Sequence, residues 1–251
     1  MKGFVKLMNR HEGERKLDFL LKKIFVGLPR KVGVKNSENS MEREWESGIF
    51  KEPVDGPVWL SKTGLTGDGQ ADLDNHGGPE KSVFVYPFEH YTNWQKELGT
   101  EIAPGGMGEN FLLENVSEES ISIGDTFQIG EAVVQVSQPR QPCWKPARRY
   151  KIKNLALLIQ NTGRTGWYFR VLQAGFIEAG QTFSIVDRPC AEWTIARCNE
   201  VMHGEIPKQK DLRDLAEIEL LAPSWRKTLE KRIEMRGAAL DIRNRVIGPN
   251  E

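Results

Sequence analysis

The sequence is poor in cysteine and histidine for its length. Its 251 residues include three cysteines, Cys143, Cys190 and Cys198, and four histidines. An odd, unclustered set of cysteines argues against a secreted disulfide framework and cannot supply the four thiolates of a common iron–sulfur cluster. No pair of histidines has the spacing of zinc ligands. The usual signatures of a disulfide-stapled or zinc-bound protein are therefore missing.

An excess of charge and a long apolar run are missing as well. Lys and Arg total 35, as do Asp and Glu, so any basic patch must be local and nothing favours nucleic acid as a partner. No apolar run approaches the roughly 20 residues of a membrane-spanning helix, and the charged N-terminus differs from a signal peptide. We therefore expect a cytoplasmic protein that binds neither nucleic acid nor membrane.

Short apolar runs broken by Gly, Pro, Asp and Asn fill most of the chain up to residue 190. Alternating apolar residues and turn pairs in SISIGDTFQIGEAVVQVSQP predict antiparallel hairpins, and strands at this spacing indicate a closed or half-closed barrel. A strand ending at Pro29 is expected in KIFVGLP, and a helix ended by Gly99 in PFEHYTNWQKELG. The charged residues 30–47 predict a loop.

The residue pattern changes after Pro189. Pro207 and Pro223 separate three segments of about three to four helical turns each. Apolar residues recur in them at helical spacing, as at Trp225 and Leu229, so we expect a small three-helix domain. The predicted organisation is an unassigned extension at 1–21, a barrel at 22–190, the three helices at 191–236 and a tail at 237–251.

The densest group of candidate ligands lies in GDGQADLDNHGGPEKSVFVYP, residues 67–87. An EF-hand loop starting at Asp72 would place Val83 where calcium requires a glutamate, so that interpretation fails. The segment has neither a P-loop nor a GxGxxG fingerprint. The adjacent Gly77 and Gly78 could bring backbone N–H groups close to an anion. A structural loop with Asx-turns explains the same residues equally well.

Two further segments carry weaker signals. The glycines of PGGMGENF, residues 104–111, fit a loop that approaches a ligand, but an ordinary turn explains them better. Residues 161–175, NTGRTGWYFRVLQAG, combine Arg164 and Arg170 with aromatic residues. Arginine binds phosphate bidentately, whereas aromatic side chains more often fill the core.

Cys143 lies in a basic and proline-rich stretch, SQPRQPCWKPARRY, residues 137–150. Nearby cations lower the pKa of a thiol, and the prolines predict a stiff, extended loop that excludes helix. A free cysteine is usually a small buried apolar residue, and Cys190 and Cys198 fit that role. The local charge instead favours a functional thiolate at Cys143.

Four blocks in this order resemble the MOSC-domain family, named for the C-terminal domain of molybdenum-cofactor sulfurases: GDGQADLDNHGGPEKSVFVYPFEHY, GGMGENF, SQPRQPCWK and GRTGWYFRVL. The bacterial YiiM subgroup is the most similar, because its three-helix domain resembles the segment from AEWTIARCNEVMHG to LAPSWRKTLEKR. The resemblance covers about residues 22–236. It implies a mainly β fold, a MOSC-type β-barrel with a few helices followed by the three-helix domain.

The resemblance also implies a bound molybdenum cofactor of the molybdopterin type, with no need for pyridoxal phosphate. The implied activity is an oxidoreductase that reduces small N-hydroxylated compounds, such as 6-hydroxylaminopurine, to amines and so detoxifies base analogues. Because the chain has no iron–sulfur or flavin motif, a separate reductase would supply the electrons. A non-catalytic carrier of cofactor or sulfur, and a molybdenum-free thiol protein, stay open as alternatives, as does a homodimer.

The family's cysteine falls on Cys143, which the resemblance implies to be the molybdenum ligand and the catalytic residue. A soft thiolate suits a soft, redox-active metal. The cofactor's phosphate calls for cations and backbone N–H groups, for which the candidates are Lys81, Arg140, Arg164, Arg170, Gly77 and Gly78. His76 and Asn110 are placed by the motifs to hydrogen-bond the pterin or the substrate.

Overall fold

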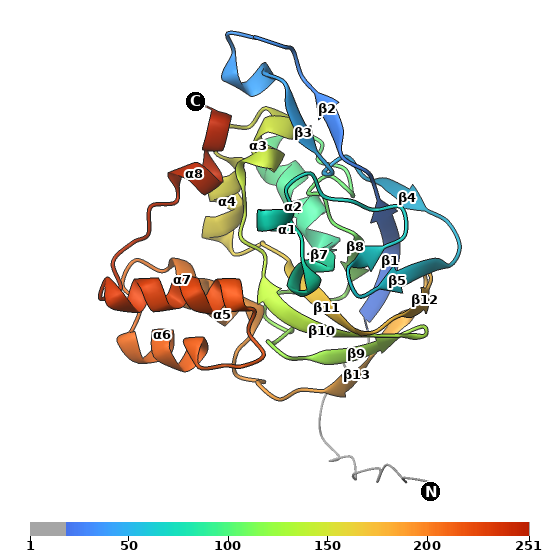
Figure 1. Ribbon diagram of the computed structural model, residues 1–251, viewed down its shortest axis with the longest axis vertical. Coiled ribbons are helices and arrows are strands. Elements are labelled where there is room, and N and C mark those ends of the chain that lie inside the picture. The colour runs from blue at the N-terminus through green and yellow to red at the C-terminus, as the bar shows by residue number, and fades with distance from the viewer. Residues whose placement is uncertain (1–18, 251) are drawn as a thin grey trace, which may run out of the picture.

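Seven strands close into a barrel in the computed structural model, which describes residues 19–250 (Figure 1). They are β1 (Phe19–Val26), β7 (Val83–Pro87), β8 (Phe111–Glu114), β9 (Thr126–Ile129), β10 (Ala132–Pro139), β11 (Trp167–Gln173) and β13 (Thr182–Asp187). Around the ring the order is β1-β8-β7-β11-β10-β9-β13, and β13 pairs with β1 again. Only the β7–β8 pair of this ring is parallel. The predicted mainly β barrel is confirmed.

Six shorter strands lie outside the ring. β4 (Glu52–Val54) extends the barrel sheet beside β1, while β5 (Val58–Ser61), β6 (Gly64–Leu65) and β12 (Gly175–Ile177) form a second sheet. β2 (Arg30–Val32) and β3 (Trp45–Ser47) pair with each other, and a 3-10 turn, Ser40–Glu42, lies between them. The prediction of a loop at 30–47 was therefore wrong. Trp45 anchors this hairpin by packing on Trp144 and Phe50, a distant contact that the charged composition conceals.

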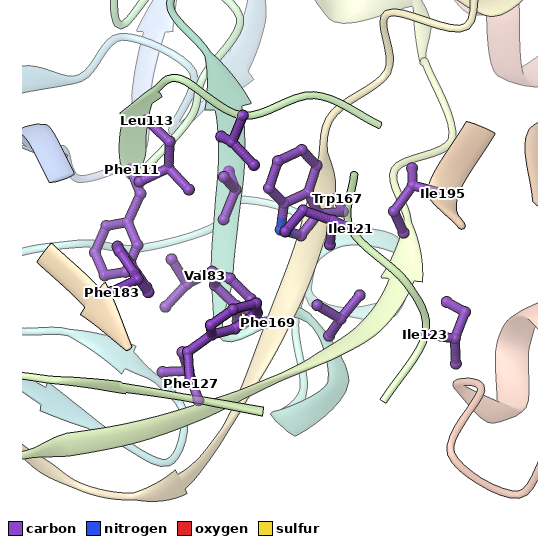
Figure 2. Close-up of a cluster of buried hydrophobic side chains, with 14 of the residues drawn as sticks. Val83, Phe111, Leu113, Ile121, Ile123, Phe127, Trp167, Phe169, Phe183 and Ile195 are labelled. Carbon is purple, nitrogen blue, oxygen red and sulfur yellow. The ribbon is translucent and has the colours of Figure 1, made fainter. Parts of the chain in front are cut away.

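Aromatic side chains fill the barrel. Phe127 lies within 6.1 Å, centroid to centroid, of the rings of Phe19, Phe169 and Phe183. Figure 2 shows three of these rings together beside Val83. The alternation in β9 and β10 puts the apolar residues inside because successive side chains of a strand point to opposite faces. Burial of these rings contributes much of the hydrophobic free energy of folding.

Eight α-helices surround the barrel within the described residues: α1 (Leu73–His76), α2 (Glu89–Leu98), α3 (Trp144–Tyr150), α4 (Leu155–Thr162), α5 (Ile195–His203), α6 (Gln209–Ala216), α7 (Pro223–Glu234) and α8 (Arg243–Val246). Two 3-10 turns, Pro79–Lys81 and Gly248–Asn250, complete the set. α2 ends as predicted at Gly99, whose φ of +60° suits glycine. None of the described helices is both long and apolar enough to cross a membrane.

Helices α5, α6 and α7 form the predicted three-helix domain. Their buried residues, among them Leu212, Trp225 and Leu229, belong to the same apolar cluster as the barrel interior. The guanidinium group of Arg232 donates hydrogen bonds to the carbonyls of Val201, Met202 and Gly204 at the end of α5. A buried cation at a helix C-terminus satisfies carbonyls that have no partner within the helix and complements the helix dipole. The domain is therefore continuous with the barrel.

The first strand begins earlier than expected. β1 starts at Phe19, so residues 19–21 belong to the barrel rather than to the extension predicted at 1–21. Phe19 is fully buried and packs on Phe183 of the closing strand. Residues 1–18 of the predicted extension lie outside the described part of the chain.

The basic stretch after Cys143 was predicted to be extended and is instead helix α3. Its proline, Pro146, occupies the third helical position after the N-cap residue Cys143. Proline is tolerated there because the first N–H groups of a helix have no intrahelical partner to lose. The three prolines therefore fix the start of a helix and do not exclude one.

The predicted tail also has structure. Asn250 is 5% exposed; its side chain accepts a hydrogen bond from Arg148 and donates one to the carbonyl of Trp144. A Cβ on Gly248 would come within 2.3 Å of the Trp144 indole, so the C-terminal segment lies directly on α3. The last residues thus help to hold the helix that begins at Cys143.

The aromatic cluster generates a stability prediction. Phe127→Ala should lower the free energy of unfolding by about 3–5 kcal/mol, because it removes a fully buried ring and leaves a cavity. Phe176→Ala is the matched control, since that ring is 49% exposed and its loss should cost about 1 kcal/mol or less. Urea unfolding monitored by circular dichroism measures both; equal losses would contradict the assignment of the core.

Candidate functional site

A cleft with a cavity of about 70 Å³ opens beside Cys143. Its walls come from five parts of the chain: residues 47–51, the 69–84 segment, residues 107–110, the segment from Arg140 to Lys145 at the start of α3, and Tyr168 of β11. Five residues predicted for the site line this cleft, namely His76, Lys81, Asn110, Arg140 and Cys143. The barrel therefore brings together the three sequence motifs that contain these residues.

The backbone on both sides of Cys143 is held by hydrogen bonds. The N–H of Arg140 donates to the carbonyl of Gly166 at the end of β10, and Arg245 donates to the carbonyl of Pro142. Cys143 itself is extended, with φ −120° and ψ 171°, and is the N-cap residue of α3. The thiol is thus fixed at the end of a short extended segment between a strand and a helix, and the prediction of extended backbone fails only from Trp144 onward.

His76 links Cys143 to a carboxylate. Its Nε2 lies 3.6 Å from Cys143 Sγ, and its Nδ1 lies 3.4 Å from Asp72 Oδ2 and 3.4 Å from Lys145 Nζ. Asp72 is held in turn as the N-cap of α1, where its carboxylate accepts from the N–H of Asn75. Burial alone would raise the pKa of Asp72, but the hydrogen bonds from Asn75 and the charges of His76 and Lys145 lower it. Asp72 therefore stays ionised beside the imidazole.

These neighbours make Cys143 acidic. Burial raises the pKa of the thiol, but the hydrogen bond and charge of His76, followed by the charge of Arg140, lower it from 9.0 to about 6. A backbone N–H at Lys145 adds to the same effect. The thiolate, which is the form that binds metals, therefore predominates at neutral pH.

Arg140 is a buried cation with an unused donor. It is 5% exposed, and its guanidinium group lies 5.0 Å from the centroid of the Phe84 ring. Its Nη1 has no hydrogen-bond partner among the described residues, although it is shielded from solvent. Because a buried unpaired donor costs free energy, an anionic oxygen in the cleft would stabilise this arrangement.

Asn110 lines the cleft but is engaged by the protein. Its amide oxygen accepts from the N–H of Phe84, and its amide nitrogen donates to the carbonyl of Phe25 and to Asp68. Asp68 also pairs with Lys51. The side chain therefore ties β1, β7 and the cleft wall together, and its expected role with pterin or substrate stays a prediction. Sequence reasoning missed Lys51, which lies outside the motifs, and it did not predict the pairing of Lys51 with Asp68 of the 67–87 segment.

The glycine-rich segment 104–111 forms a fixed wall. Glu109 is fully buried and accepts hydrogen bonds from the Tyr91 hydroxyl, at 2.5 Å, and from the N–H of Gly105. A Cβ on Gly106 would come within 2.0 Å of the Tyr150 hydroxyl oxygen. These glycines are required by close packing, which supports a structural explanation of the motif.

Four other predicted residues do not line this cleft. Arg164 forms a bidentate ion pair with Glu97, whereas Arg170 donates to Glu80, Gln135 and the carbonyl of Leu220. The remaining two, Gly77 and Gly78, connect α1 to the next turn. A role for these four residues in cofactor binding stays a prediction without support from the cleft geometry.

Comparisons with known proteins agree with this architecture. The MOSC domain matches residues 72–184, and the YiiM-like, 3-alpha helix domain matches residues 193–236. An uncharacterized protein of Bacillus subtilis, YflK, is 40% identical over 187 residues, which are 74% of this chain and 85% of that protein. Protein YiiM of Escherichia coli is 34% identical over 206 residues, 80% of this chain and 91% of that protein.

A third relative and one solved structure add to these matches. A protein of Gibberella moniliformis named reductase is 39% identical over 165 residues, 64% of this chain but 29% of that protein. The crystal structure of YiiM from Geobacillus stearothermophilus superimposes with a TM-score of 0.71 at 33% identity. That match covers 86% of this chain and 99% of the other.

The acidic thiol generates a pH prediction for protein prepared without metal. Alkylation of Cys143 by iodoacetamide should rise with a midpoint near pH 6, because the lowered pKa makes the thiolate dominant above that value. Cys190 is an internal control, since burial and nearby carboxylates raise its pKa. Peptide mapping by mass spectrometry follows both; a Cys143 midpoint at or above pH 8.5 would contradict the His76 and Arg140 contacts.

Proposed function

The chain belongs to the MOSC-domain family, in its YiiM-like branch, and on this premise we propose that it binds the molybdenum cofactor and reduces N-hydroxylated compounds to amines. The acidic thiol of Cys143 at a cleft lined by cations carries the proposal. A relative named reductase supports the oxidoreductase class.

The residues of the cleft fit such a cofactor. Cys143 offers one soft thiolate ligand for the metal. Arg140, with its unpaired buried donor, is suited to the cofactor's phosphate, and Lys81 and Lys145 add positive charge to the same cleft. When bound, the molybdenum cofactor supplies a two-electron redox centre for cleavage of an N–O bond.

The overall conversion requires two electrons and two protons for each R–NHOH, and it releases R–NH2 and water. His76 is suited to hold a proton at Nε2, next to Cys143, while Asp72 orients the ring from the other side. The sequence has three unclustered cysteines and no flavin motif, so we propose a separate reductase as the electron donor. A small N-hydroxylated base analogue is the substrate class proposed for this cleft.

Replacing the thiolate tests this function. Cys143→Ser should abolish reduction of 6-hydroxylaminopurine and lower bound molybdenum, because a hydroxyl is a poor ligand for a soft metal. Cys190→Ser is the control and should leave both unchanged. Turnover with an added reductase and metal analysis measure the two quantities. Full activity in Cys143→Ser would overturn the assignment, and cofactor bound by the wild type without turnover under several reductases would favour a carrier.

The proposed arginine contact can be tested separately. Arg140→Gln should reduce retained cofactor at least about tenfold, since it removes a buried, charge-assisted hydrogen bond worth about 1.5–3 kcal/mol. Arg164→Gln should have little effect, because its guanidinium group is already paired with Glu97. Cofactor content after gel filtration provides the measurement. A greater loss in Arg164→Gln than in Arg140→Gln would reverse the assignment.

A further inference from the structure

A second cleft lies where the three-helix domain meets the C-terminal segment. A cavity of about 430 Å³ lies between the end of α5, one face of α7, residues 239–242 and α8. Figure 1 shows the C-terminal chain running from the end of α7 to α8, which lies beside α4. Gln141 lines this cleft, whereas Arg140 and Cys143 line the first one. The two clefts therefore lie on either side of the Arg140–Cys143 segment.

Positive charge predominates in the lining of the second cleft. Lys227 and Lys231 lie one helical turn apart on α7, and neither has an ion-pair or hydrogen-bond partner within residues 19–250. Arg232 and Arg245 add two guanidinium groups. Of the described residues that line the cleft, Asp241 is the one carboxylate. The lining thus holds four cations and one anion, an excess of positive charge within the cleft itself.

Arg245 is a cation held by neutral groups. Its guanidinium group donates to the carbonyl of Pro142 and to the side-chain oxygen of Gln160, at 2.5 Å, and to no carboxylate among the described residues. Burial lowers the pKa of Arg245 to about 10, with the charge of Cys143 opposing and that of Arg140 adding to the shift. Since burying a cation without a carboxylate costs free energy, an anion in the cleft would offset part of that cost.

His203 offers a further unused group. Its Nε2 is shielded from solvent and has no hydrogen-bond partner among residues 19–250, although the residue lines the cleft. Burial, reinforced by the charges of Arg245 and Arg232, lowers the pKa of His203 to about 3, so the imidazole is neutral at physiological pH. A neutral imidazole can donate one hydrogen bond to an anionic oxygen. An orphaned polar atom and uncompensated cations thus line the same cavity.

We propose that this second cleft is a binding site for a phosphate-bearing small molecule, distinct from the Cys143 cleft. A phosphate group supplies the oxygens and negative charge that the two lysines, Arg245 and His203 lack. The cavity volume lies in the range of small-molecule binding sites and exceeds that needed by a lone ion. The site does not depend on the function proposed for Cys143.

Charge reversal on α7 tests the site. Lys227→Glu/Lys231→Glu should weaken binding of pyrophosphate and of ATP at least about tenfold, because it replaces attraction by repulsion at exposed positions that the fold does not need. Lys96→Glu/Lys153→Glu is the matched control, since both lysines are exposed and unpaired and the change in net charge is the same. Isothermal titration calorimetry on the full chain measures binding, and circular dichroism checks folding.

A third variant separates the two clefts. Lys81→Gln/Arg140→Gln removes cations from the Cys143 cleft and should leave pyrophosphate binding to the second cleft intact. The proposal would be overturned if this variant lost pyrophosphate binding while Lys227→Glu/Lys231→Glu kept it. It would also be overturned if the α7 variant and the Lys96→Glu/Lys153→Glu control lost binding equally. Failure of wild type to bind either probe at millimolar concentration would also overturn it. If ATP binds more tightly than pyrophosphate, the ligand of this cleft is a nucleoside phosphate. If the two bind with equal affinity, the cleft recognises the phosphate groups alone.

Discussion

The contact between Cys143 and His76 is the interaction around which the first cleft is arranged. A thiolate at a half-buried position loses hydration, so it persists only where a neighbouring charge or donor replaces the lost water. His76 provides that replacement, and Asp72 and Lys145 both lie 3.4 Å from Nδ1 on the far side of its ring. The short helices α1 and α3 position two of these groups, because Asp72 is the N-cap residue of α1 and Cys143 that of α3.

The barrel makes this contact geometrically stable. β10 ends just before Cys143, and β7 follows the segment that contains His76, so the two sit at ends of strands joined through β11. Closure through the β13–β1 pair removes the free edges of the ring and limits how far those strand ends can move apart. The C-terminal segment then covers α3, with Asn250 and Arg245 satisfying carbonyls that flank Cys143. A closed barrel thus supports a site built from strand ends, short helices and the segments that connect them.

The features that the sequence predicted well depend on residues close together in the chain. Period-two alternation identified the hairpins, Gly99 the end of α2, and helical spacing the three-helix domain, because each depends on neighbouring residues. Contacts between residues far apart in the chain could not be predicted from the sequence. Cys143 and His76 are 67 positions apart, and the Trp144–Asn250 contact spans 106. The basic residues show the same limit: Arg140, Arg164 and Arg170 resemble one another in sequence, and only the positions of Glu97 and Glu80 distinguish a paired cation from a free one.

Pairing of charge also explains why a neutral composition is compatible with two cationic clefts. Equal totals of acidic and basic residues do not mean that every basic side chain has an acidic neighbour. Several carboxylates form ion pairs away from both clefts, as Asp125 does with Arg188. Arg140, Arg245 and the lysines of α7 are left facing neutral oxygens, an aromatic ring or solvent. A fold selected for stability alone would gain by pairing or removing a buried cation such as Arg140. The unpaired positive charge around both cavities is therefore the common basis of the two proposed anionic ligands.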